Sequence, residues 1–220
     1  MNLYSISLKS SREAYSKGLL ARLTLVILLS PLALAITPAH AQGQDHRQYL
    51  PLVSRPASPC PFNAITNGGF EQDDLGWTLA SYPEFKSHDL IGTRDEGFSP
   101  IQGVYAARLG AVEGVVDSIR QAVLIPEQGV LSYYWKMYTN EEPTNIYDFM
   151  DVDLLNPDGT RLLHLVVHNN KDLNDLWVRD VFDLPAYAGQ SAILQFYSYN
   201  DNYYWTKFDI DEVRLCGQGD

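Results

Sequence analysis

Two stretches of the sequence alternate apolar with polar or aromatic residues, and their polar positions carry the chemistry of a sugar site. In residues 131–138 and 192–199, alternation leaves two outward-pointing sets: Tyr134, Lys136 and Tyr138, and Gln195, Tyr197 and Tyr199. Flat rings stack on the C–H face of a pyranose, while amide and charged groups hold its hydroxyls. If the two strands are sheet neighbours, these side chains form one binding face. The alternative is a tyrosine-rich solvent face, which is common in β-proteins.

A loop offers a rival aromatic site. Tyr203, Tyr204 and Trp205 follow an Asn-Asp-Asn turn at residues 200–202 and could form a rim beside the sheet. We therefore include Trp205 among the predicted ligand-binding residues.

Catalytic chemistry has weaker support in the sequence. Asp151 and Asp153 share a strand face and resemble paired carboxylates, but no general acid partner is identifiable. His164 and His168 would also share an outward face, yet residues four apart on a strand are separated by about 13 Å, too far to chelate one ion together. No G-x-S-x-G or H-E-x-x-H motif is present. The sequence predicts a protein without catalytic activity, and a hydrolase with an unfamiliar site is the remaining alternative.

Short strands that are separated by turns must position these residues. Eight segments are rich in β-branched, aromatic or alternating apolar residues: 105–109, 118–125, 131–138, 149–155, 161–168, 176–182, 192–199 and 207–215. The Asn-Pro-Asp-Gly run at residues 156–159 predicts a hairpin turn between two of them. No convincing amphipathic helix is found. The pattern predicts an all-β fold, an antiparallel jelly-roll β-sandwich in a single domain over residues 62–220.

The first 41 residues have the three parts of a cleavable export signal. Four basic residues precede an apolar run over residues 23–36, and Ala39-His40-Ala41 supplies small residues at the cleavage site. The alternative is an uncleaved membrane anchor, but the run is short and has prolines in or beside it. We expect cleavage after Ala41, a secreted protein, and no membrane insertion after cleavage. Residues 42–61, rich in Pro, Ser and Gln, are predicted to be an extended leader.

The chain has two cysteines, Cys60 and Cys216, one at each end of the predicted domain. In an oxidising compartment they should form a disulfide, and the alternative is two free buried thiols. The whole chain has a net charge of −11, and since the signal carries four basic residues and one acidic residue, the remainder carries −14. Such a surface repels nucleic acid and anionic lipid, so both are excluded as main partners.

A family resemblance rests on motifs that occur in a fixed order. They are N-G-G-F-E at residues 67–71, G-W at 76–77, and the segments 103–110, 118–126, 131–135, 183–190 and 208–213. In this order they resemble the galactose-binding-like jelly rolls, a superfamily that includes carbohydrate-binding modules and accessory domains of bacterial extracellular peptidases. The resemblance covers the whole globular part and implies a binding module.

The same resemblance implies a structural calcium ion. In calcium-binding relatives the ion lies between the N-G-G-F-E carboxylate and an acid of the closing strand, which here are Glu71 and Asp211. Independently, residues 71–74 and 209–212 form two acidic clusters that the disulfide would bring to one edge, and Ca²⁺ prefers such oxygen ligands. The alternative is that these carboxylates are simply solvated. Taken together, the sequence predicts a secreted non-catalytic binding module for an extracellular glycan; a protein-interaction or structural domain that binds a cell-surface protein is the alternative.

Overall fold

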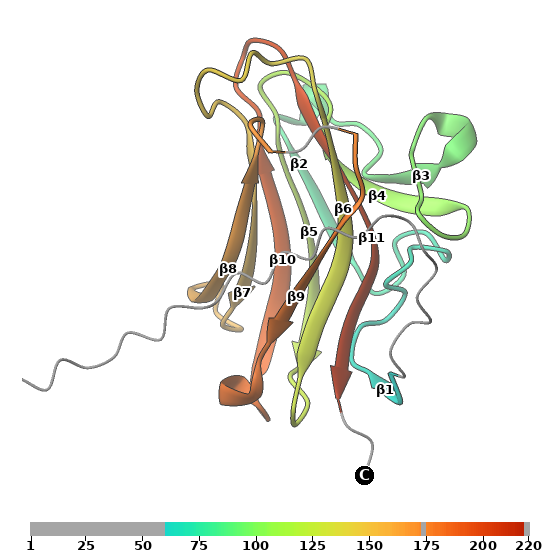
Figure 1. The fold of residues 1–220 in the computed structure, drawn as a ribbon, viewed down its shortest axis with the longest axis vertical. Helices are drawn as coiled ribbons and strands as arrows, with labels where there is room; N and C mark the ends of the chain where they lie inside the picture. Colours follow the sequence, from blue (N-terminus) through green and yellow to red (C-terminus); the bar gives the residue numbers. More distant parts are fainter. Residues whose placement is uncertain (1–59, 173–174, 218–220) are drawn as a thin grey trace, which may run out of the picture. The chain divides into compact units, whose positions relative to one another are not determined.

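The computed structural model describes residues 60–172 and 175–217, which form two antiparallel sheets packed face to face (Figure 1). The predicted signal peptide and most of the predicted leader lie outside the described residues. The six-stranded sheet has the order β3 (Ile91–Thr93), β4 (Tyr105–Gly110), β11 (Thr206–Gly217), β6 (Val130–Thr139), β9 (Val178–Asp183), with β1 (Phe62–Asn63) added on β11. The five-stranded sheet has the order β2 (Thr78–Tyr82), β5 (Val116–Leu124), β10 (Ser191–Tyr199), β7 (Phe149–Leu155), β8 (Arg161–Asn169).

All eight predicted strands are present, as β4 to β11, and the predicted all-β sandwich is confirmed. The three strands that the sequence pattern missed, β1 to β3, are at most five residues long, too short for an alternation to be recognised. Within the described residues the helices are three 3₁₀ turns of three residues each, Glu84–Lys86, Arg94–Glu96 and Pro185–Tyr187. None of these could cross a membrane.

Consecutive strands usually change sheet, which is the arrangement of a jelly roll. From β4 to β7 the chain alternates between the six-stranded and five-stranded sheets at each step, and from β9 to β11 it does so again. The exceptions are β3 and β4, which pair within the six-stranded sheet, and the β7–β8 hairpin, which turns at the predicted Asn-Pro-Asp-Gly run and stays within the five-stranded sheet. Strands that are close in sequence therefore present their outward side chains on opposite faces of the molecule.

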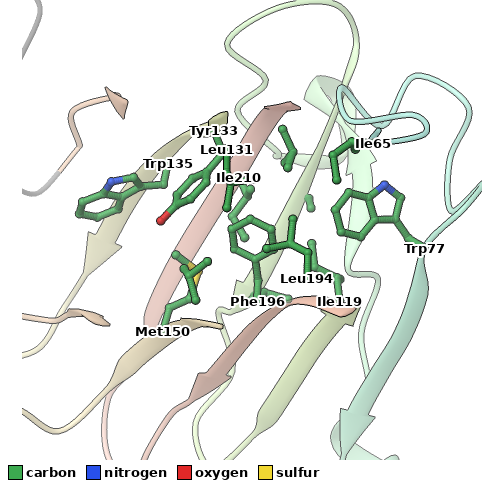
Figure 2. Packing of buried hydrophobic residues seen from close by; sticks show 14 of the residues in the cluster. Ile65, Trp77, Ile119, Leu131, Tyr133, Trp135, Met150, Leu194, Phe196 and Ile210 are labelled. Atoms are coloured by element: carbon green, nitrogen blue, oxygen red, sulfur yellow. The ribbon is translucent and has the colours of Figure 1, made fainter. Parts of the chain in front are cut away.

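The core fills the space between the two sheets (Figure 2). Alternate residues of β6 point inward, including Tyr133 and Trp135, and meet Phe196 from β10 in the opposite sheet. The ring centroids of Tyr133 and Phe196 are 5.0 Å apart and the rings are nearly perpendicular, an arrangement that aromatic pairs favour. The inward-pointing residues of each strand thus pack in the core, and the outward-pointing residues are available for binding.

The predicted disulfide between Cys60 and Cys216 is confirmed, with the two Cα atoms 5.3 Å apart. It joins Cys60, two residues before β1, to Cys216 near the end of β11, where Cys216 pairs with Asn63. Close by, β11 bulges between Asp211 and Arg214, and the Val213 amide donates to the Gly68 carbonyl at 2.9 Å. A Cβ on Gly68 would lie 1.9 Å from the Val213 carbonyl oxygen, which explains why the N-G-G-F-E motif needs glycine there.

A buried ion pair fixes the centre of the six-stranded sheet on its outer side. The Arg108 guanidinium of β4 donates to both carboxylate oxygens of Asp209 on β11, at 2.6 and 3.1 Å. It also donates to the Gly97 carbonyl and lies 4.4 Å from the centre of the Phe98 ring. The loop after β3 therefore covers the pair, and both charged groups are almost completely buried.

Candidate functional site

The outer face of the five-stranded sheet carries aromatic and polar side chains in parallel rows. One row across β2, β5, β10 and β7 contains Tyr82, Val116, Tyr199 and Phe149. The next contains Ala80, Ser118, Tyr197 and Asp151, and the third contains Thr78, Arg120, Gln195 and Asp153, followed by His164 on β8. Directly paired residues of antiparallel strands point to the same side, so the face changes from aromatic to charged along the strands.

A groove of about 440 Å³ crosses the polar part of this face. It is lined by Arg120, Asp151, Asp153, Leu155, Gly159, Arg161, Gln195 and Tyr197. The lining combines one aromatic ring with carboxylates, an amide and guanidinium groups. The groove therefore offers hydrogen-bond donors and acceptors beside one flat ring.

Two residues hold the Asp153 carboxylate in a fixed position at the base of the groove. His164 Nδ1 lies 2.8 Å from one carboxylate oxygen and Arg161 donates to the other at 3.1 Å. The Gln195 side chain lies beside them, almost fully buried, and its carbonyl oxygen has no hydrogen-bond partner. Burial raises the pKa of Asp151, and the nearby charge of Asp153 raises it further. The groove therefore presents hydrogen-bonding groups whose positions are set before a ligand arrives.

Tyr197 lies between the aromatic row and the polar groove. Its ring packs against Phe149 with centroids 6.4 Å apart, and Phe149 in turn stacks on Tyr199 at 5.6 Å. Burial raises the pKa of Tyr197, and the Asp151 carboxylate adds to the effect. The half-buried ring is thus neutral and held by neighbouring rings, and one part of it lines the groove.

The predicted single face does not exist, because β6 and β10 belong to different sheets. Gln195, Tyr197 and Tyr199 lie on the outer face of the five-stranded sheet, whereas the outward residues of β6 lie on the opposite side of the sandwich. The predicted set therefore separates into two groups. The second group is Tyr134, Lys136, Tyr138 and Trp205.

The groups of this second set are largely engaged with one another. The Tyr138 and Trp205 rings stack with centroids 6.4 Å apart, and Lys207 Nζ lies 5.1 Å from the centre of the Tyr138 ring. Lys136 forms an ion pair of 2.6 Å with Asp175, and the Arg179 guanidinium lies over the Tyr134 ring. The rings and the lysine of this second group therefore contact neighbouring side chains on the outer face of the six-stranded sheet.

The expectation that His164 and His168 share an outward face is wrong. The pairing of β7 with β8 shifts register by one residue, so Asp153 faces His164 while Met150 faces His168. The bulge turns His168 into the core, where its ring stacks on Trp135 at 3.7 Å and its Nε2 lies 2.8 Å from Asp180 Oδ2. Alternation predicts the side of the sheet to which a residue points only where the pairing of the strands is regular.

Glu71 and Asp211, the predicted calcium ligands, lie close together around Gly69. A Cβ on Gly69 would be 3.8 Å from Asp211 Oδ1 and 3.9 Å from Glu71 Cγ. Each carboxylate also accepts backbone N–H groups: Glu71 from Val104 and Tyr105, and Asp211 from Ile101, Gln102 and Glu212. Burial raises the pKa of Asp211 to about 7, although the Gln102 amide opposes the shift. Asp209, from the same acidic cluster, is instead paired with Arg108.

A second group of acids, which no sequence pattern reveals, could hold a metal ion. Glu141, Asp148 and Asp201 each place a carboxylate oxygen within 4.8 Å of the other two. They come from the loop between β6 and β7 and the loop between β10 and β11, so no local spacing reveals them.

No protein-family model and no curated protein matches this sequence. Among solved structures, the chain is similar to the carbohydrate-binding module TmCBM61, solved in complex with β-1,4-galactotriose, with 14% identity and a TM-score of 0.50. The match covers 70% of this chain and 97% of that one. It is similar to the K1 cleaved adhesin domain of Lys-gingipain from Porphyromonas gingivalis W83, with 15% identity and a TM-score of 0.50, over 69% of this chain and 96% of that one. The likeness to these two structures shows that the chain has their β-sandwich fold.

Proposed function

We propose that this protein is a secreted, non-catalytic binding module and that it binds an extracellular glycan in the groove of the five-stranded sheet. The observation that carries the proposal is the groove itself, in which the Tyr197 ring lies beside Gln195, Asp153 and Arg161. A sugar ring stacked on Tyr197 would place its hydroxyls within reach of these polar groups. The shared fold of a carbohydrate-binding module gives further support.

The groove is suited to a neutral sugar more than to a strongly charged one. Arg120 and Arg161 are balanced by Asp151 and Asp153 in the same lining, and Arg161 is close to both acids, at 3.7 and 3.1 Å. An anionic ligand would meet the two carboxylates, and a cationic ligand would meet the two guanidinium groups. A glycan array that includes neutral, acidic and amino sugars tests this preference directly.

Replacing Tyr197 by alanine should weaken glycan binding by about tenfold or more, because a ring buried against a ligand contributes roughly 1–3 kcal/mol. Isothermal titration with the tightest ligand from the array measures the loss. Tyr134→Ala is the matched control, since Tyr134 is also a half-buried tyrosine but lies on the opposite outer face. Equal affinity of the Tyr197→Ala protein and the parent would remove the groove as the site.

A protein-interaction domain is the second candidate function, and one surface favours it. Phe85 and Tyr203 are exposed over 85% and 75% of their area. Their segments both bond to residues 113–114, because Lys86 donates to the Glu113 carbonyl and the Gly114 amide donates to the Asp201 carbonyl. Exposed aromatic surface of this kind is typical of contacts with other proteins. Failure of every glycan on the array, together with capture of a defined cell-surface protein that Phe85→Ala abolishes, would favour this function.

We also propose a structural calcium ion between Glu71 and Asp211. Asp211 is completely buried and Glu71 is exposed, and both carboxylates lie beside Gly69, where a cation would offset their repulsion. Removing calcium with excess chelator should lower the melting temperature by several degrees, since an ion bound only to the native state stabilises it by mass action. The Glu71→Gln protein should show a smaller chelator shift than the parent, and an identical shift in both proteins would contradict this location.

A further inference from the structure

Three carboxylates converge at the end of the sandwich that lies opposite the disulfide. Glu141 and Asp148 belong to the loop between β6 and β7, and Asp201 belongs to the loop between β10 and β11. Figure 1 shows both loops at the top of the molecule, while the last residues of β11 lie at the bottom. One oxygen atom from each residue lies within 4.8 Å of the others, which is the spacing of ligands around a cation with metal–oxygen distances of about 2.4 Å.

The position of the Asp148 side chain adds evidence beyond the clustering of acids. Asp148 is completely buried. Its Oδ1 accepts the Asp201 amide at 2.8 Å, but its Oδ2 is buried without a hydrogen-bond partner. Oε1 of Glu141 is also buried and has none. A buried carboxylate oxygen without a partner carries a large free-energy cost, which a bound cation would remove.

In the described part of the chain, no basic side chain is paired with these acids. Among residues 60–172 and 175–217, no lysine, arginine or histidine forms an ion pair with any of the three acids. Burial raises the pKa of Glu141, and the charges of Asp148 and Asp201 raise it further. Burial also raises the pKa of Asp148, although the Asp201 amide and the nearby Thr206 offset part of the shift. The arrangement is therefore costly without a positive charge at its centre.

We propose that Glu141, Asp148 and Asp201 bind a calcium ion that ties the two loops together. The ligand set contains only oxygen atoms, which favours a hard cation over a transition metal. Ca²⁺ is preferred to Mg²⁺ because loop ligands give irregular geometry, and Mg²⁺ requires a near-octahedral site. Carbonyl oxygens and water would complete the coordination. The site is separate from Glu71 and Asp211, and it does not depend on the proposed glycan groove.

The proposed ion would hold an exposed aromatic loop in place. Asp201 begins the segment that carries Tyr203 and Tyr204, and its Oδ1 accepts the Tyr203 amide at 2.8 Å. The Trp205 amide donates to Asn140 Oδ1, next to Glu141, at 2.8 Å. Calcium bound between the loops would therefore reduce the mobility of this segment as well as stabilise the fold.

Calcium titration of the parent, Glu141→Gln and Glu142→Gln proteins tests the site. Glu142 is the matched control because it is the adjacent acid on the same loop but lies outside the cluster and is exposed. Loss of a ligand should weaken calcium binding at this site by about 100-fold or more, since even residues that only orient ligands contribute 10- to 100-fold. The parent and Glu142→Gln proteins should bind one more Ca²⁺ per chain than the Glu141→Gln protein.

Melting temperatures separate a lost ligand from a damaged fold. In excess chelator, the melting temperature of the Glu141→Gln protein should be at least as high as that of the parent, because one repelling carboxylate is gone. In millimolar calcium, the parent should have the higher melting temperature. Asp201→Asn should behave in the same way. The proposal is wrong if the parent binds no calcium, or if Glu141→Gln and Asp201→Asn proteins bind as many ions as the parent with unchanged affinity. It is also wrong if only Glu71→Gln removes the bound ion.

Discussion

Removal of the Cys60–Cys216 disulfide should lower the free energy of unfolding by about 5 kcal/mol, the largest effect expected of any change considered. The two cysteines are 156 residues apart, so the bond closes nearly the whole described domain into one loop in the unfolded state. In the chain-entropy model the stabilisation increases with the length of that loop. Since single domains are stable by only about 5–15 kcal/mol, the reduced protein should be close to unfolding.

Urea denaturation of the parent and the Cys60→Ala/Cys216→Ala protein measures this effect. The chain has no other cysteine, so a reducing agent should destabilise the parent and leave the double variant unchanged. A difference of less than about 1 kcal/mol between the oxidised parent and the double variant would contradict the expected contribution of the bond.

Replacing Arg108 by methionine should destabilise the protein by about 3–5 kcal/mol, because Asp209 would be left buried without a countercharge. Asp209 is only 2% exposed, and Arg108 supplies both hydrogen bonds of the pair. The variant also loses the hydrogen bond to the Gly97 carbonyl that holds the loop over the sheet. Chemical denaturation followed by tryptophan fluorescence gives the free energies.

Lys136→Met is the matched control for this prediction. It removes the cation of an ion pair on the same outer face, but the partner Asp175 is more than half exposed, so the cost should stay below about 1 kcal/mol. In the Arg108→Met/Asp209→Leu protein, where no charge remains buried, much of the stability should return. Similar losses for Arg108→Met and Lys136→Met would show that burial of the Asp209 charge is unimportant.

The strands of the fold were predictable because each long strand has one face in the core. In β10, for example, Leu194 and Phe196 point inward and alternate with outward polar residues, so the two-residue period is plain in the sequence. The edge strand β2 was missed because its exposed side chains produce no such contrast. The disulfide was predictable because only two cysteines exist.

The placement of the site was only partly predictable. Alternation correctly identifies Tyr134 and Tyr197 as outward residues, but the sheet to which each strand belongs depends on the crossovers between sheets, which no local pattern encodes. The orientation of His168 depends on a bulge in β8, and a bulge of one residue reverses every side chain beyond it. The acids at positions 141, 148 and 201 meet only through the packing of two loops.

Nuclear magnetic resonance of the tyrosine-labelled protein tests the central claim most directly, because it reports which outer face meets the glycan. The measurement follows the ring signals of the parent protein as the tightest array ligand is added. Tyr197 and Tyr199 should shift with the ligand concentration, whereas Tyr134 and Tyr138, on the other sheet, should stay unchanged. Shifts at Tyr134 and Tyr138 without shifts at Tyr197 and Tyr199 would contradict the assignment of the binding face.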